Sequence, residues 1–150
     1  MRVMIYYNLN RYVWSIRALE GPYKGLVIAH AKQVILSGGV PKVCESMRQR
    51  SIQQQRRSLH AGLQGELVYW QADPRTPTVS GRTADALRQN TRWPAKAAKL
   101  LETATTHGQR VTYRPFKAGY FMNPETEQPI ALQQWTVFCA DRKTYTCDGL

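Results

Sequence analysis

Hydrophobic residues in the first forty positions recur with the period of two that is typical of short β-strands. Val3–Asn10 is rich in strand formers, and apolar and polar residues alternate along Tyr12–Leu19. Together with the polar turn at residues 8–11, these two runs predict a hairpin. Leu26–Ala31 and Gln33–Ser37 predict a third and a fourth strand, the fourth ending at the two glycines that follow it.

From Pro41 the pattern becomes that of a helix. A proline suits the first helical position because its missing N–H would have no partner there, and Glu45 complements the dipole of the first turn. At 100° per residue one narrow stripe is apolar or small, formed by Val40, Val43, Cys44, Met47 and Ser51. We predict a basic amphipathic helix that leads into a strand carrying His60, with the sheet packed on this stripe. The alternative is an ordinary surface helix whose arginines serve solubility and the dipole.

The second half of the chain predicts further strands interrupted by helices. Leu59–Trp70 has strand character, and the block 71–108 begins as a loop and then predicts two helices, at 84–89 and 94–108. Three later strands are predicted at Gln109–Phe116, Leu132–Ala140 and Thr144–Cys147. The expected fold class is α+β: a mainly antiparallel sheet packed on one basic helix, with a two-helix insertion, in a single domain.

Charge adds a class of partner to this picture. The formal net charge is +11, of which +8 falls in residues 1–60 and +3 in residues 61–150. Such asymmetry favours one basic face and a polyanionic partner, nucleic acid before an acidic protein surface. Charge that serves only solubility is the plainer alternative. A membrane surface is disfavoured because the helix stripe lacks bulky apolar anchors.

Several classes of function have no motif in the chain. The three cysteines lack CxxC spacing, which predicts reduced thiols in a cytosolic compartment. P-loop, GxGxxG and GxSxG patterns are absent, and so is the His/Cys spacing of a zinc site. No apolar run has the length of a membrane span, and the first residues do not resemble a signal peptide. We therefore expect neither a metal nor another cofactor.

The residues predicted to contact nucleic acid are Lys42, Arg48, Arg50, Arg56, Arg57, Tyr113 and Arg114. Phosphate contact by such cations needs no base-specific geometry. Aromatic side chains of the first hairpin also offer stacking faces: Tyr6, Tyr7, Tyr12 and Trp14. The alternation of Tyr12 and Trp14 with Ile16 favours a place in the core for that pair.

His30 and His60 raise an enzymatic alternative. Both are predicted near strand ends beside the basic helix, and two imidazoles can act as general base and acid in metal-independent cleavage of RNA. The plainer interpretation is that each makes a structural hydrogen bond at the edge of the sheet. The sequence gives only their residue type and approximate place, whereas a catalytic pair is tested by its mutual geometry. The structural interpretation is therefore favoured.

Several segments resemble a group of small uncharacterised bacteriophage proteins: Ile5–Leu9 (IYYNL), Trp14–Ile16 (WSI), Gly25–His30 (GLVIAH), the basic helix running into Arg57–Gly62 (RSLHAG), and Tyr113–Phe116 (YRPF). The similarity covers most of residues 3–67 and a shorter piece near 110–130, but not the 71–108 block. The chain departs from the group at Gln53-Gln54-Gln55, where the group is more densely charged. The resemblance supplies no activity. It implies the cytoplasm of an infected bacterium and a role in host takeover or counter-defence.

Charge, helix and resemblance lead to one leading hypothesis and two alternatives. The leading one is a phage-encoded basic protein that binds nucleic acid, RNA before DNA, or a host ribonucleoprotein such as a CRISPR effector. The first alternative is a small metal-independent ribonuclease that uses His30 and His60. The second is a protein–protein inhibitor or virion component anchored by the aromatic loop Lys117–Asn123. The sequence leaves the oligomeric state open.

Overall fold

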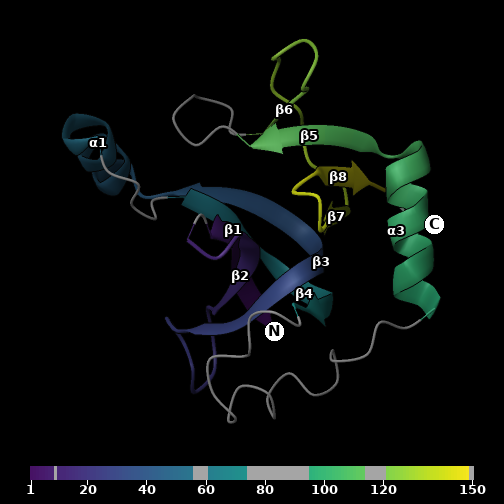
Figure 1. The fold of residues 1–150 in the computed structure, drawn as a ribbon, viewed down its shortest axis with the longest axis horizontal. Helices are drawn as coiled ribbons and strands as arrows, with labels where there is room; N and C mark the ends of the chain where they lie inside the picture. The colour runs from purple at the N-terminus through teal and green to yellow at the C-terminus, as the bar shows by residue number, and fades with distance from the viewer. Residues whose placement is uncertain (9, 56–60, 74–94, 114–120, 149–150) are drawn as a thin grey trace.

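The fold is built from eight antiparallel strands and two helices in the part of the chain that the computed structural model describes, residues 1–8, 10–55, 61–73, 95–113 and 121–148 (Figure 1). The strands are β1 (Arg2–Asn8), β2 (Val13–Ala18), β3 (Val27–Val43), β4 (Ala61–Ala72), β5 (Gln109–Tyr113), β6 (Phe121–Met122), β7 (Trp135–Phe138) and β8 (Thr144–Cys147). The helices are α1 (Glu45–Gln54) and α3 (Ala95–His107). The mainly antiparallel α+β class is confirmed. Neither of these helices has the length and apolar character needed to cross a bilayer.

The first four strands close on themselves. β1 pairs with β2 and β4, and β3 pairs with β4 and β2, all antiparallel. Side chains that alternate along these strands meet inside the ring and form the main core, which includes Val3, Ile5, Ile16, Leu36 and Leu63. The predicted hairpin is confirmed, with Tyr7 opposite Trp14 and Asn8 opposite Val13.

β3 is one strand of 17 residues where the sequence predicted two strands and the start of a helix. Its register shifts three times against β4, and Gly38 adopts a φ of 63°. Such bulges bend a strand without ending it. Pro41 is therefore a strand residue, paired with Leu63, and the prediction that it begins the helix is wrong. Along its edge away from β4, β3 pairs first with β2 and then, further along the chain, with β7. The pairing with β7 joins the ring to the strands β7, β8, β5 and β6.

Helix α1 does not pack on the sheet, and this part of the predicted fold is wrong. Ser51 is its single buried residue, and neither core cluster of the described residues includes a residue of α1. Figure 1 shows the helix standing away from the strands. Two members of the predicted stripe, Val40 and Val43, belong to β3 instead. What remains of the stripe is too small to hold the helix against a core.

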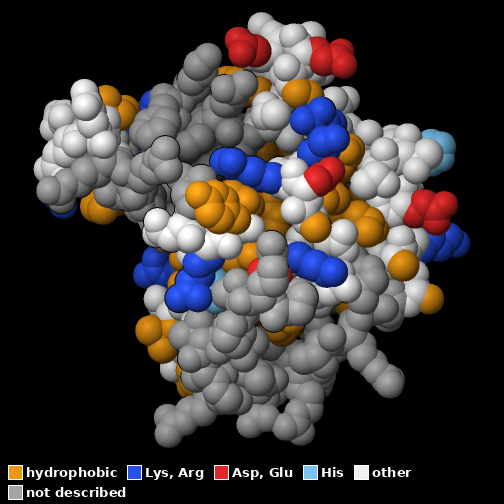
Figure 2. All heavy atoms as spheres, in the orientation of Figure 1, with side chains coloured by type: hydrophobic (Ala, Val, Ile, Leu, Met, Phe, Trp, Pro, Cys, Tyr) orange, Lys and Arg blue, Asp and Glu red, His pale blue; other side chains and the backbone are white. Residues whose placement is uncertain are grey.

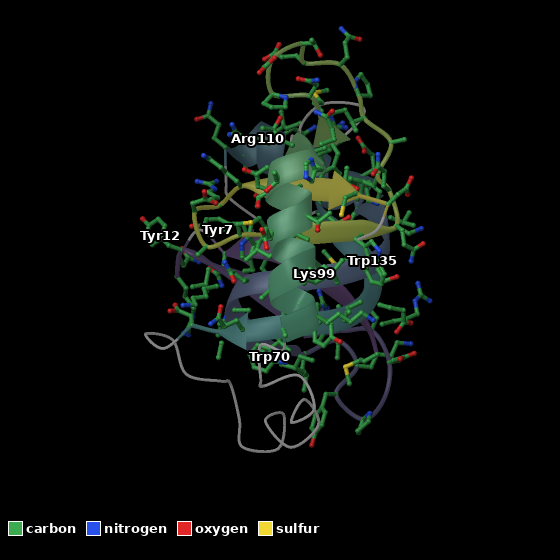
Figure 3. The ribbon with its side chains drawn as sticks, turned by 90° about the vertical axis from the view of Figure 1, so that its right-hand side faces the viewer. Tyr7, Tyr12, Trp70, Lys99, Arg110 and Trp135 are labelled. Carbon is green, nitrogen blue, oxygen red and sulfur yellow. The ribbon has the colours of Figure 1, made fainter. Side chains whose placement is uncertain are left out.

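Helix α3 covers the sheet instead. Its buried residues Ala97, Leu100 and Ala104 follow a helical repeat and pack on Ile35 and Val137. Figure 3 shows α3 lying across the strands. This helix is the second of the predicted insertion, whereas the first, at 84–89, lies outside the described residues.

Candidate functional site

The turn between β1 and β2 presents an exposed tyrosine. The side-chain Oδ1 of Asn8 accepts hydrogen bonds from the backbone N–H groups of Asn10 and Arg11, at 3.0 and 3.2 Å. The backbone N–H of Tyr12 donates to the carbonyl of Asn8 at 2.7 Å. Tyr12 has a left-handed φ of 58°, unusual for a bulky side chain, and is 69% exposed. The Asn8 contacts hold the turn in a conformation that carries this ring into solvent.

A buried row of polar groups continues inward from the turn. Asn8 donates from Nδ2 to Ser15 Oγ at 3.2 Å, and Ser15 Oγ lies 3.1 Å from His30 Nδ1. The backbone N–H of Asp73 donates to the His30 carbonyl at 3.3 Å. His30 is only 4% exposed, and burial, followed by the nearby Arg11 charge, lowers its pKa. The imidazole thus supports the turn from within and does not face solvent.

A cavity of about 250 Å³ opens beside the turn. The residues described around it are Tyr7, Tyr12, Val13, Trp14, Lys32, Asp73 and Ala140. Trp14 is fixed there because its ring Nε1–H donates to the Cys139 carbonyl at 3.0 Å and because its ring packs edge to face with Tyr7, with 5.1 Å between the ring centroids. The cavity therefore combines firmly held aromatic side chains with one cation and one carboxylate.

Cations from three separate segments surround these aromatic residues. Arg142 lies over the Tyr7 ring, 4.4 Å from its centroid, and Lys32 lines the cavity from β3. Arg11 is exposed in the turn beside Tyr12. Figure 3 shows Tyr12 at the edge of the molecule with Tyr7 beside it, and Figure 2 turns that edge to the viewer, where Lys and Arg side chains lie among hydrophobic ones. We call Tyr7, Arg11, Tyr12, Lys32 and Arg142 the aromatic–basic surface.

Those sequence-predicted cations that belong to the described residues lie elsewhere. Lys42 and Arg50 are exposed on the α1 side of the molecule, whereas Arg48 donates to Glu45 at 2.8 Å and its side chain is 16% exposed. Tyr113 belongs to β5, and its side chain is not among those described. Outside the described residues lie Arg56, Arg57, Arg114 and His60. The structure thus places His30 beneath the aromatic–basic surface rather than beside the α1 cations.

Two predictions about aromatic residues are corrected. Trp14 is in the core as alternation predicted, but Tyr12 is not, because β2 begins at Val13 and Tyr12 belongs to the turn. In the predicted aromatic loop Phe121 is buried in β6 and cannot anchor a partner, and residues 117–120 lie outside the description. Lys32, Asp73 and Arg142 were not singled out by the sequence. The one available signal was the polar turn between two strands.

The comparisons with known proteins identify a phage family. A family model described as Mycobacterium phage L5 gene 82 protein matches residues 1–85. The Gene 82 protein of Mycobacterium phage L5 is 35% identical over 74 residues, which are 45% of this chain and 59% of that relative. No solved structure matches the chain.

The matched region contains most of the cavity. Of the described residues that line the cavity, Ala140 alone lies beyond the match. Arg142, which belongs to the aromatic–basic surface, also lies beyond it. The family match extends through residue 85, into the 71–108 block that the resemblance did not cover. It does not include the segment near 110–130, which the resemblance did cover. The resemblance to small bacteriophage proteins is confirmed, and the chain belongs to the family of the Mycobacterium phage L5 gene 82 protein.

Proposed function

We propose that the protein binds a single-stranded segment of nucleic acid, RNA before DNA, at the aromatic–basic surface. The observation that carries the proposal is Tyr12, held 69% exposed at a cavity that Lys32 lines and with Arg142 over the neighbouring Tyr7. Proteins that bind unpaired strands combine aromatic faces, on which bases stack, with cations that follow the phosphates. The net charge of +11 supports the same kind of partner.

Single strands suit this surface better than a duplex. A ring that projects from a turn can stack only on a base that has left its own stack, and an unpaired strand offers such bases at little cost. Duplex recognition instead uses a helix or a strand pair that enters a groove. The described basic helix α1 is short, and one of its arginines, Arg48, is engaged with Glu45.

The family supports a role during infection. The protein that gives the family its description is a phage gene product. We place the binding in the cytoplasm of an infected bacterium. There, engagement of a host ribonucleoprotein through its RNA, in host takeover or counter-defence, is the role that fits a small basic binding protein. The alternative ribonuclease gains no support from His30, which is buried and bonded to Ser15.

A salt series with matched double variants tests the proposal. For an unstructured RNA strand, we expect the affinity of the wild-type protein to fall steeply as salt rises, because bound cations release counterions. Replacing Lys32 and Arg142 together by Gln is expected to weaken binding and to reduce the slope of log K against log salt by about 1.4, roughly 0.7 for each lost contact. Fluorescence polarisation with a labelled strand measures both quantities.

The control removes the same charge from the other side of the molecule. Replacing Lys42 and Arg50 together by Gln is expected to leave affinity and slope close to wild type. Loss of binding in this control, with none in the Lys32 and Arg142 variant, would place the contact on the predicted α1 side instead. Affinity that does not respond to salt would exclude phosphate contact altogether.

A further inference from the structure

We infer that the cavity beside Tyr12 accepts one guanine base of the bound strand, with Asp73 and Lys32 as the residues that distinguish it from other bases. The inference rests on the proposed function and adds a preference for one base. Its evidence is the combination of groups around one cavity of about 250 Å³: aromatic rings, one carboxylate and one ammonium.

Asp73 supplies a carboxylate that lines the cavity. It directly follows β4, lines the cavity and is 4% exposed, and its backbone N–H is bonded to the His30 carbonyl. An ionised carboxylate only accepts hydrogen bonds, and its two oxygens offer about four lone-pair sites, so it can serve a ligand in addition to partners within the protein. Hydrogen bonds to a group removed from water are also stronger than exposed ones.

Guanine is the base whose edges match both charged residues. Its Watson–Crick edge presents two adjacent donors, N1–H and the 2-amino group, to the two oxygens of a carboxylate. Its O6 and N7 are acceptors of the kind that a lysine ammonium contacts. Adenine and cytosine offer one amino group next to a ring acceptor, and uracil offers one N–H between two carbonyls. Each of these would leave one carboxylate oxygen facing an acceptor.

The aromatic residues supply the remaining requirement. Tyr7 and Trp14 already contact each other edge to face, so they form a wall that need not rearrange. Tyr12 lines the same cavity from the turn and is free to cover a base from the solvent side. Stacking alone is tolerant of sequence. The preference for one base must therefore come from Asp73 and Lys32.

The test varies the base at one position of the ligand. Fluorescence polarisation at fixed salt compares four short uridine strands whose central position is guanosine, inosine, adenosine or uridine. For the wild-type protein we expect the guanosine strand to bind about 5- to 150-fold more tightly than the uridine strand, the range that one bidentate contact provides. Inosine lacks the 2-amino donor and is expected to bind more weakly than guanosine.

A matched pair of variants assigns the preference to Asp73. Asp73→Asn leaves one acceptor oxygen and is expected to lose the distinction between guanosine and inosine. Asp148→Asn makes the same change at an exposed site and should keep it. If Asp73→Asn does not fold, as judged by circular dichroism, the four strands with wild-type protein decide the question alone.

The outcomes separate this inference from the proposed function. Equal affinity for all four strands overturns the guanine inference and leaves single-strand binding in place. No measurable affinity for any strand overturns the proposed function, and the inference with it. Competition with free GMP tests whether the guanine must belong to a strand. If GMP displaced the labelled guanosine strand at concentrations equal to that of the strand, the cavity would bind guanine, but the rest of the strand would add nothing to binding.

Discussion

Replacing Tyr12 by Ala is expected to weaken the binding of single-stranded RNA by about 5- to 150-fold, the equivalent of one lost base–aromatic stack. The free energy of unfolding should not fall with it, because Tyr12 is 69% exposed and lies outside both core clusters of the described residues. Polarisation assays and urea denaturation measure the two quantities on the same preparations.

Tyr12→Phe is the matched control for this change. It keeps the aromatic face and removes only the hydroxyl, so affinity should remain within a few-fold of wild type. Tyr12→Asn adds a second comparison, since asparagine tolerates the left-handed φ of 58° and removes the ring without straining the turn. If the alanine and asparagine variants bound as tightly as wild type, Tyr12 would have no part in recognition.

Replacing Leu100 by Ala is expected to lower the free energy of unfolding by about 2–5 kcal/mol, the usual cost of a cavity left by a buried leucine. Leu100 is fully buried between α3 and the sheet, in the cluster that contains Ile35 and Val137. The effect is large because α3, rather than α1, covers this part of the sheet. Urea denaturation followed by circular dichroism measures it.

Lys99→Ala, on the exposed side of the same helix, is the control for Leu100 and should change stability by no more than about 0.5 kcal/mol. Equal small effects from both substitutions would mean that α3 contributes little to the folded state. A selective loss in Leu100→Ala would establish α3 as the cover of the sheet.

Local patterns predicted the elements better than their contacts. The hairpin, the strands β4, β5, β7 and β8, and the helix before Gln109 follow from period and turn signals, whereas the two-residue β6 does not. The long β3 did not, because bulges and a left-handed Gly38 let it continue through residues that usually end a strand. The apparent stripe of α1 was misleading for the same reason, since Val40 and Val43 belong to that strand.

The candidate site depends on contacts between distant parts of the chain. Tyr12 and Lys32 lie near each other in sequence, but Asp73 follows β4 and Arg142 lies in the turn between β7 and β8. Single residues of common types, separated by up to 130 positions, give no local signal. His30, in contrast, was a candidate site residue in the sequence because of its residue type. In the structure it supports the turn through Ser15 and Asn8.

Ultraviolet crosslinking of a 4-thiouridine-containing RNA to the wild-type protein, followed by peptide mapping, tests most directly where a strand contacts the molecule. Cleavage after Arg11 and Arg17 releases Tyr12–Arg17 as one tryptic peptide, well separated from the peptides of α1. Binding at the aromatic–basic surface predicts that the crosslinked nucleotide is found on this peptide. Crosslinks confined to residues 43–56, with none on Tyr12–Arg17, would contradict it.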